Sequence, residues 1–185
     1  NGLCNGSMDT VSILDNNGCP ASYTFETICT PAGNCPPLVT FTQGGWGAQA
    51  NGNNPGTYLN ANFATAFQKG LVIGSGPKTV TLTTAAAVQK VLPSGGTPSI
   101  LNVTGINPSN LNNVLAGQLV AATLNVSFDY YDPNFAGPSQ NLGKMYCNFA
   151  PFLCMSVDQV IAEANQAISG TITAHSLTDL NNALD

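Results

Sequence analysis

This sequence contains no arginine and has few charges of either sign. Its four lysines and nine acidic residues give a formal net charge of −5 over 185 residues. Charged residues make up 7% of the chain, against about a quarter in an average soluble domain. A protein that must stay monomeric usually carries mixed charges over its surface. The shortage of charge therefore indicates a chain for which association is part of the purpose.

A basic stripe and a long apolar run are also missing. Binding to nucleic acid or to anionic lipid needs clustered basic residues, and four scattered lysines do not provide them. No apolar run approaches the roughly 20 residues that span a bilayer. We therefore expect neither nucleic acid nor membrane insertion. The first residues do not resemble a signal peptide, so we expect a secretion signal to have been removed already.

Cysteine, by contrast, is present in an even number, as expected of a disulfide set in an oxidising compartment. Two short loops, 29–35 and 147–154, are possible, and so is a link between the N-terminal region and residue 147 or 154. No pair has the C-x2-C spacing of a structural zinc site. We expect disulfides and neither metal nor other cofactor. The candidate disulfide residues are Cys4, Cys19, Cys29, Cys35, Cys147 and Cys154.

Residue patterns predict strands in the first hundred residues and helices in the rest. A helix is also expected over residues 60–68, and another from a Thr84 cap to Leu92, before Pro93. Residues 109–128 favour a helix capped by Ser109, with a possible strand at its end. Capping boxes at Ser156 and Ser176 open two further helices, the first closed by Gly170. The expected strands lie at residues 23–28, 38–42, 71–73 and 79–82.

These elements predict an α+β fold. The N-terminal half is expected to be strand-rich, as a sandwich-like sheet, with helices in the C-terminal half and disulfides stapling the whole. The length suits a single extracellular domain over residues 1–185. Within it, residues 1–37 form a cysteine-rich N-terminal segment and residues 38–185 a module.

The module carries an ordered set of motifs. They are TQGGWG at residues 42–47, NNPG at 53–56, GLVIG at 70–74 and AGQLVAATLNV at 116–126. Together they resemble a module of secreted and surface-displayed bacterial proteins, notably of the Bacteroidota, over roughly residues 38–185. The resemblance implies an extracellular or cell-surface location. It implies no catalytic residues.

Aromatic and acidic residues provide the candidate binding groups. Trp46 could stack on a sugar ring together with Tyr58, Tyr130 and Tyr131, since aromatic faces offer apolar area beside a polar group. The alternative for Trp46 is that its glycine neighbours let the ring fold onto the core. Oxygens near Asp129 and Asp132 are weak calcium candidates, but Asx turns explain such clusters as well.

Catalytic arrangements are weaker still. His175, Ser176 and Asp179 are close in sequence, but a helix start accounts for the last two, and we expect His175 on the surface. There is no G-x-S-x-G nucleophile motif. Asp129 and Asp132 have only their proximity to favour a glycosidase pair. We therefore expect no enzymatic activity.

The leading hypothesis is a secreted structural protein that self-associates into an extracellular filament, matrix or surface layer. Few charges repel neighbouring copies, and many amides and hydroxyls can bond across contacts. Strand addition is one possible joint between copies. No segment among residues 1–20 shows a clean strand alternation, however, so packing of folded subunits is equally expected. The alternative is a carbohydrate-binding or adhesive surface module.

Overall fold

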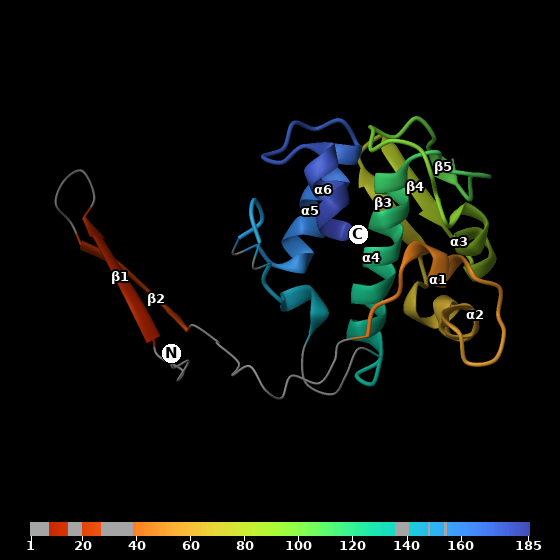
Figure 1. Cartoon of the computed structure of the whole chain (residues 1–185), viewed down its shortest axis with the longest axis horizontal. Helices are drawn as coiled ribbons and strands as arrows, with labels where there is room; N and C mark the ends of the chain where they lie inside the picture. Colours follow the sequence, from red (N-terminus) through yellow and green to blue (C-terminus); the bar gives the residue numbers. More distant parts are fainter. Residues whose placement is uncertain (1–7, 15–19, 27–38, 136–140, 148, 154) are drawn as a thin grey trace. The chain divides into compact units, whose positions relative to one another are not determined.

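The computed structural model describes residues 8–14, 20–26, 39–135, 141–147, 149–153 and 155–185 (Figure 1). The chain divides into two compact units, Asn1–Pro37 and Leu38–Asp185. Because these units differ in architecture, we describe each by itself, as unit 1 and unit 2.

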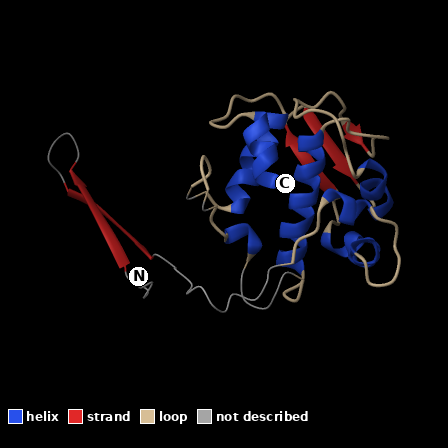
Figure 2. Cartoon of the chain, in the orientation of Figure 1, coloured by secondary structure: helices blue, strands red, loops and turns tan. Residues whose placement is uncertain are grey.

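The described part of unit 1 is a two-stranded antiparallel hairpin (Figure 2). Strand β1 (Met8–Leu14) pairs with β2 (Pro20–Glu26) along its whole length. The sequence predicted a strand near β2 but missed β1. The four central pairs of the register alternate between hydroxyl and apolar residues: Thr10↔Thr24, Val11↔Tyr23, Ser12↔Ser22 and Ile13↔Ala21. The outer pairs, Met8↔Glu26, Asp9↔Phe25 and Leu14↔Pro20, do not follow this alternation.

Unit 2 is built around one small mixed sheet. Strand β3 (Leu71–Ser75) pairs antiparallel with β4 (Lys78–Leu82), and β4 pairs in parallel with the two-residue strand β5 (Gly105–Ile106). The strands predicted at residues 71–73 and 79–82 are therefore confirmed. Alternate residues of β3 and β4 are buried, which fixes the face that the sheet turns to the core.

A long central helix organises the rest of unit 2. Helix α4 (Val114–Tyr131) packs against β3 and against helices on both of its sides (Figure 1). Most of its residues are buried, because its neighbours surround it. The other helical elements are α1 (Gln43–Gly47), α2 (Pro55–Ala66), α3 (Ala85–Val91), the 3-10 turn η1 (Leu142–Lys144), α5 (Val157–Ile168) and α6 (Leu177–Leu184).

Most of the predicted helix signals are confirmed. Thr84 caps α3, and Ser156 and Ser176 form capping boxes that open α5 and α6. Gly170 follows α5 with a φ of +91°, as expected of a residue that ends a helix.

Both boundaries of α4 differ from the prediction. Asn113, not Ser109, caps α4: its side chain accepts from the Ala116 N–H and donates to the Ser99 carbonyl at 2.6 Å. The strand expected at the end of this segment does not form, because the helix continues to Tyr131.

The predicted strand-rich N-terminal half and its sandwich-like sheet are wrong. No strand occupies residues 39–42, and two helices lie at residues 43–47 and 55–66. Thr42 caps α1, while Asn54 caps α2 directly before Pro55. The helix predicted over residues 60–68 is present as α2, but it begins earlier, because Asn followed by Pro is a strong helix start.

Stapling by disulfides is not seen either, because the described residues contain no disulfide. Only Cys147 falls within the described ranges, where burial raises the pKa of its thiol. The other five predicted disulfide residues lie outside the described residues.

Candidate functional site

Trp46, the first candidate stacking residue, lies wholly inside unit 2. Its side chain is fully buried, and its indole Nε1 donates to Asn125 Oδ1 at 3.1 Å. The ring packs edge-on against Phe41, at 5.2 Å between centroids, and stacks on Phe135. A ring enclosed in this way presents no face to an external sugar.

Two of the four motifs, at residues 42–47 and 116–126, meet in this core. Asn125 also accepts from the Phe41 N–H at 2.9 Å and donates to the Phe41 carbonyl at 3.0 Å. Gln43 is buried and accepts from the Ser94 N–H at 2.9 Å. Its amide lies where a side chain on Gly117 would have to go, so α4 needs glycine there. The motifs at residues 42–47 and 116–126 therefore pack directly against each other within unit 2.

The hydroxyls of the three candidate tyrosines all form bonds within unit 2. Tyr58 is half-buried and donates its hydroxyl to Asp132 at 2.9 Å; burial and this bond raise the pKa of Tyr58. Tyr130 and Tyr131 are exposed, but their hydroxyls bond to different helices. The carbohydrate-binding alternative stays a prediction that no described surface favours.

The two candidate calcium residues already have partners within the chain. Asp129 is buried and accepts from the Leu142 N–H at 2.7 Å. Asp132 accepts from the Asn134 N–H at 3.0 Å, which together with the Tyr58 hydroxyl lowers the pKa of this carboxyl. The bond from Asn134 is that of an Asx turn. Among the described residues, no group of three or more His, Cys, Asp or Glu is placed to hold a metal.

A second polar cluster joins the end of α4 to the start of α5. Tyr130 donates to Asp158 Oδ2 at 2.6 Å, and this bond raises the pKa of Tyr130 to about 12. Lys144 Nζ lies 3.4 Å from the same Asp158 oxygen. Gly143 lies so close to both side chains that an added Cβ would clash with them. These contacts hold η1 against the end of α4 and the start of α5.

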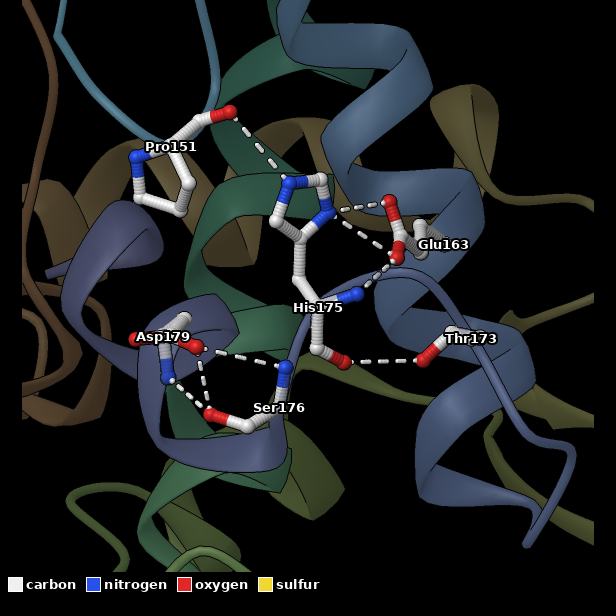
Figure 3. A network of polar contacts seen from close by, with 6 residues as sticks. All are labelled: Pro151, Glu163, Thr173, His175, Ser176 and Asp179. Atoms are coloured by element: carbon white, nitrogen blue, oxygen red, sulfur yellow. Dashed lines mark hydrogen bonds and ion pairs between the residues drawn. The ribbon is translucent and has the colours of Figure 1, made fainter.

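His175 and Glu163 form a partly buried ionisable pair in unit 2 (Figure 3). The side chain of His175, expected on the surface, is 15% exposed and therefore partly buried. Its Nδ1 lies 3.0 and 2.9 Å from the two carboxylate oxygens of Glu163, and its Nε2 lies 3.3 Å from the Pro151 carbonyl. The imidazole packs on Phe152 with 4.2 Å between ring centroids.

The surroundings of His175 favour its charged form. The hydrogen bond with Glu163 is the largest cause that raises the pKa of His175, and burial opposes it only in part. The charge of Glu163, the Pro151 carbonyl and the charge of Asp179 raise this pKa further. Glu163 also accepts from the His175 backbone N–H at 2.8 Å, so its position is fixed from two directions.

The geometry does not assemble a catalytic triad here. Ser176 Oγ donates to Asp179 at 2.6 Å and accepts from the Asp179 N–H, as a helix cap does (Figure 3). His175 Nε2 faces the Pro151 carbonyl instead of a hydroxyl. An open cavity of about 470 Å³ lies beside Glu163, but this carboxylate, its only ionisable lining group, is already paired with His175.

Sequence reasoning missed Asn125, Glu163 and Pro151 as site residues. Asn125 lies 79 positions from Trp46 and 84 from Phe41, so no local pattern joins them. Glu163 lies on α5 as an ordinary helix residue, and Pro151 acts through its backbone carbonyl, which any residue has. One signal was available in the sequence. The chain has a single histidine and only nine acidic residues, so each acidic residue could have been considered as its partner.

Comparison of the chain with protein-family models, with curated proteins and with solved structures gave no match. The resemblance to a bacterial surface module thus stays a prediction. Within the ranges that the structure covers, no helix has both the length and the apolarity to cross a membrane. The functional conclusion rests on the architecture of the chain itself.

Proposed function

We propose that this chain is a secreted structural protein that self-associates into an extracellular filament, matrix or surface layer, with hairpin β1–β2 as the joint between copies. The observation that carries this proposal is the pairing of two seven-residue strands with each other and with no other described strand. A hairpin of this kind is at best marginally stable in water, and it needs a third strand or a packed surface.

The register of the hairpin fits such a joint. In its four central pairs, apolar pairs such as Val11↔Tyr23 alternate with hydroxyl pairs such as Thr10↔Thr24. This alternation is typical of a strand pair that covers one face and leaves the other in water. Each strand also has an outer side along which another strand can add through backbone hydrogen bonds. A second copy of the chain offers both an equivalent strand and an equivalent face.

The sheet of unit 2 is less suited to strand addition. The N–H groups of Gly74 and Ser75, in β3, donate to Asn165 Oδ1 at 2.7 Å and to Ser169 Oγ at 2.6 Å. Helix α5 thus occupies part of one sheet edge with side-chain acceptors. At the other edge, β5 is only two residues long. Covered or very short edge strands are devices that limit pairing with other chains.

The charges of unit 2 are also consistent with association. Lys144 pairs with Asp158, and Glu163 pairs with His175. Charged residues make up only 7% of the chain, so few charged groups have to be desolvated when two copies meet.

The test compares two single-charge variants in adjacent positions of β2. Tyr23→Lys places a charge in an apolar pair of the register, whereas Thr24→Lys places the same charge in a hydroxyl pair. Light scattering and electron microscopy should show multimers of the native protein. We expect Tyr23→Lys to reduce the multimer fraction at least tenfold, the effect of about 1.4 kcal/mol per contact, and Thr24→Lys to reduce it much less.

A native protein that stays a monodisperse monomer at high concentration would overturn the proposal. This result is also expected if unit 2 of the same chain covers the hairpin. Equal effects of the two lysines would show that added charge, and not the hairpin register, controls association.

A further inference from the structure

We propose that His175 is a pH-dependent latch. In its protonated form it holds Pro151 and Phe152, the tip of segment 149–153, against α5, and it releases this tip on losing its proton. The proposal is independent of self-association. It rests on the two ring nitrogens of one imidazole, each of which faces an acceptor (Figure 3).

The number of protons on the ring decides how many of these acceptors are satisfied. The Pro151 carbonyl can only accept hydrogen bonds, and so can the side chain of Glu163 when it is ionised. An imidazolium carries two N–H groups and can donate to both, whereas neutral imidazole carries one. The neutral ring therefore leaves a nitrogen lone pair facing an oxygen. Because the carboxylate is charged and lies closer, at 2.9 Å against 3.3 Å, the bond to Pro151 is the one that is lost.

The charged groups around the ring are of one sign. Glu163 acts from α5, and Asp179 acts from α6 at longer range. The segment that contributes Pro151 and Phe152 presents a carbonyl oxygen and an aromatic ring, which also favour a cation at 4.2 Å. Each of these neighbours attracts the imidazolium more than the neutral ring.

The latch acts on a segment that is anchored elsewhere at its base. The Cys147 N–H donates to the Met155 carbonyl at 2.8 Å, and the Val157 N–H donates to the Met145 carbonyl at 2.9 Å. These bonds hold the base whatever the protonation of His175. At the tip, the Met155 N–H donates to the Phe152 carbonyl at 3.0 Å, and Phe152 is buried. Loss of the bond to Pro151 should therefore loosen the tip without releasing the segment.

The residues beside the tip are apolar and exposed. Phe149 and Leu153 flank the buried Phe152 and are 45% and 59% exposed. Loosening the tip would change how these two apolar side chains are presented. The protonated state fixes them in one arrangement.

The direction of the pH dependence follows from the raised pKa of His175. A group whose pKa is higher in the folded state contributes its full stabilisation below the unfolded value of about 6.5. That contribution disappears as the pH rises through the folded pKa. The latch is thus closed below about pH 6.5 and opens as the pH rises through the raised pKa of His175.

Because His175 is the only histidine, its imidazole signals can be followed by NMR in the intact chain without assignment. We expect a midpoint above 6.5 in the native protein. Glu163→Gln should move the midpoint down, whereas Asp158→Asn, on the same helix but bonded to Lys144 and Tyr130, should leave it unchanged. Both variants remove one carboxylate from α5.

Hydrogen exchange of the peptide that covers residues 145–155 tests the mechanical half of the proposal. Relative to α4 amides, its protection should fall roughly three- to tenfold when the pH rises across the midpoint, as expected for one lost hydrogen bond. His175→Gln should remove this pH dependence. A native midpoint at or below 6.5, or equal protection on both sides of the midpoint, would overturn the latch.

Discussion

The two β-structures of this chain treat their edges in different ways. In unit 2, Asn165 and Ser169 take up N–H groups of β3, and the opposite edge strand is two residues long. In unit 1, β1 and β2 are each seven residues long and have only each other as partners among the described strands. Sheets that must not associate hide or shorten their edges. The edges of the unit 2 sheet are thus covered or short, whereas the hairpin of unit 1 has the longer edges that the proposed self-association requires.

Unit 2 also differs from the described part of unit 1 in having a closed hydrophobic core. Trp46, Leu59, Phe128 and Leu180 come from four different helices, and all have side chains with essentially no exposure. A two-stranded hairpin has too few elements to enclose such a core by itself. Stability and association are thus expected to depend on different units, and the predictions below test that separation.

The largest effect is expected from removal of unit 1. A chain of residues 38–185 keeps the whole buried core of unit 2. Its thermal midpoint should match that of the unit 2 transition in the full chain, while multimers should be lost. Sedimentation velocity and calorimetry on both chains provide the measurement. Undiminished multimers in the shorter chain would place the joint in unit 2 and contradict the comparison.

Trp46→Ala should have the next largest effect, on stability alone. The indole fills the core between Phe41 and Phe135 and donates to Asn125. Truncation of a buried aromatic residue to alanine costs about 3–5 kcal/mol, so denaturant unfolding followed by circular dichroism should show a large loss. Tyr131→Ala is the control, because this ring is exposed.

The Tyr131→Ala change should cost less than about 1 kcal/mol, as is usual for surface positions. A small loss for Trp46→Ala as well would mean that the core closes without the indole. In that case the structural explanation of the motif at residues 42–47 would be wrong.

Local signals explain which helices could be predicted from the sequence. The side chains of Thr84, Ser156 and Ser176 bond to backbone groups three residues away, so the relevant partners lie within the same short segment. The same reasoning failed at Ser109, because Asn113 was the better cap once Ser99, from a distant turn, supplied an acceptor for its amide. Capping is readable from sequence only where no tertiary contact competes.

The candidate site was less predictable, because its partners are far apart in the chain. Trp46 was recognised as either a ligand platform or a core residue, and only the bond to Asn125 and the enclosing rings decide between these. His175 looked like a surface residue because Glu163 and Pro151 lie 12 and 24 positions away. Strand β1 was missed for a related reason, since its alternation becomes clear only in register with β2.

The smallest effect, and the most specific one for the comparison, is expected at the edge of β3. Asn165→Ala removes the acceptor of the Gly74 N–H, and it also removes the bond from the Asn165 amide to the Ile161 carbonyl. The loss of stability should be about 1 kcal/mol, the usual net value of a hydrogen bond. Gln166→Ala is the matched control, because Gln166 is the next residue of α5 and its side chain is exposed.

This edge variant should be made in the chain of residues 38–185, where the hairpin cannot contribute. Sedimentation velocity over a range of concentrations should detect weak association of Asn165→Ala and none of Gln166→Ala, because only the first opens a donor on a sheet edge. If both variants stay monomeric while Asn165→Ala alone loses stability, then Asn165 serves the fold and the edge is protected by α5 as a whole. If the two variants are equally stable, the bond to Gly74 contributes nothing, and the contrast between the edges rests on the short β5 alone.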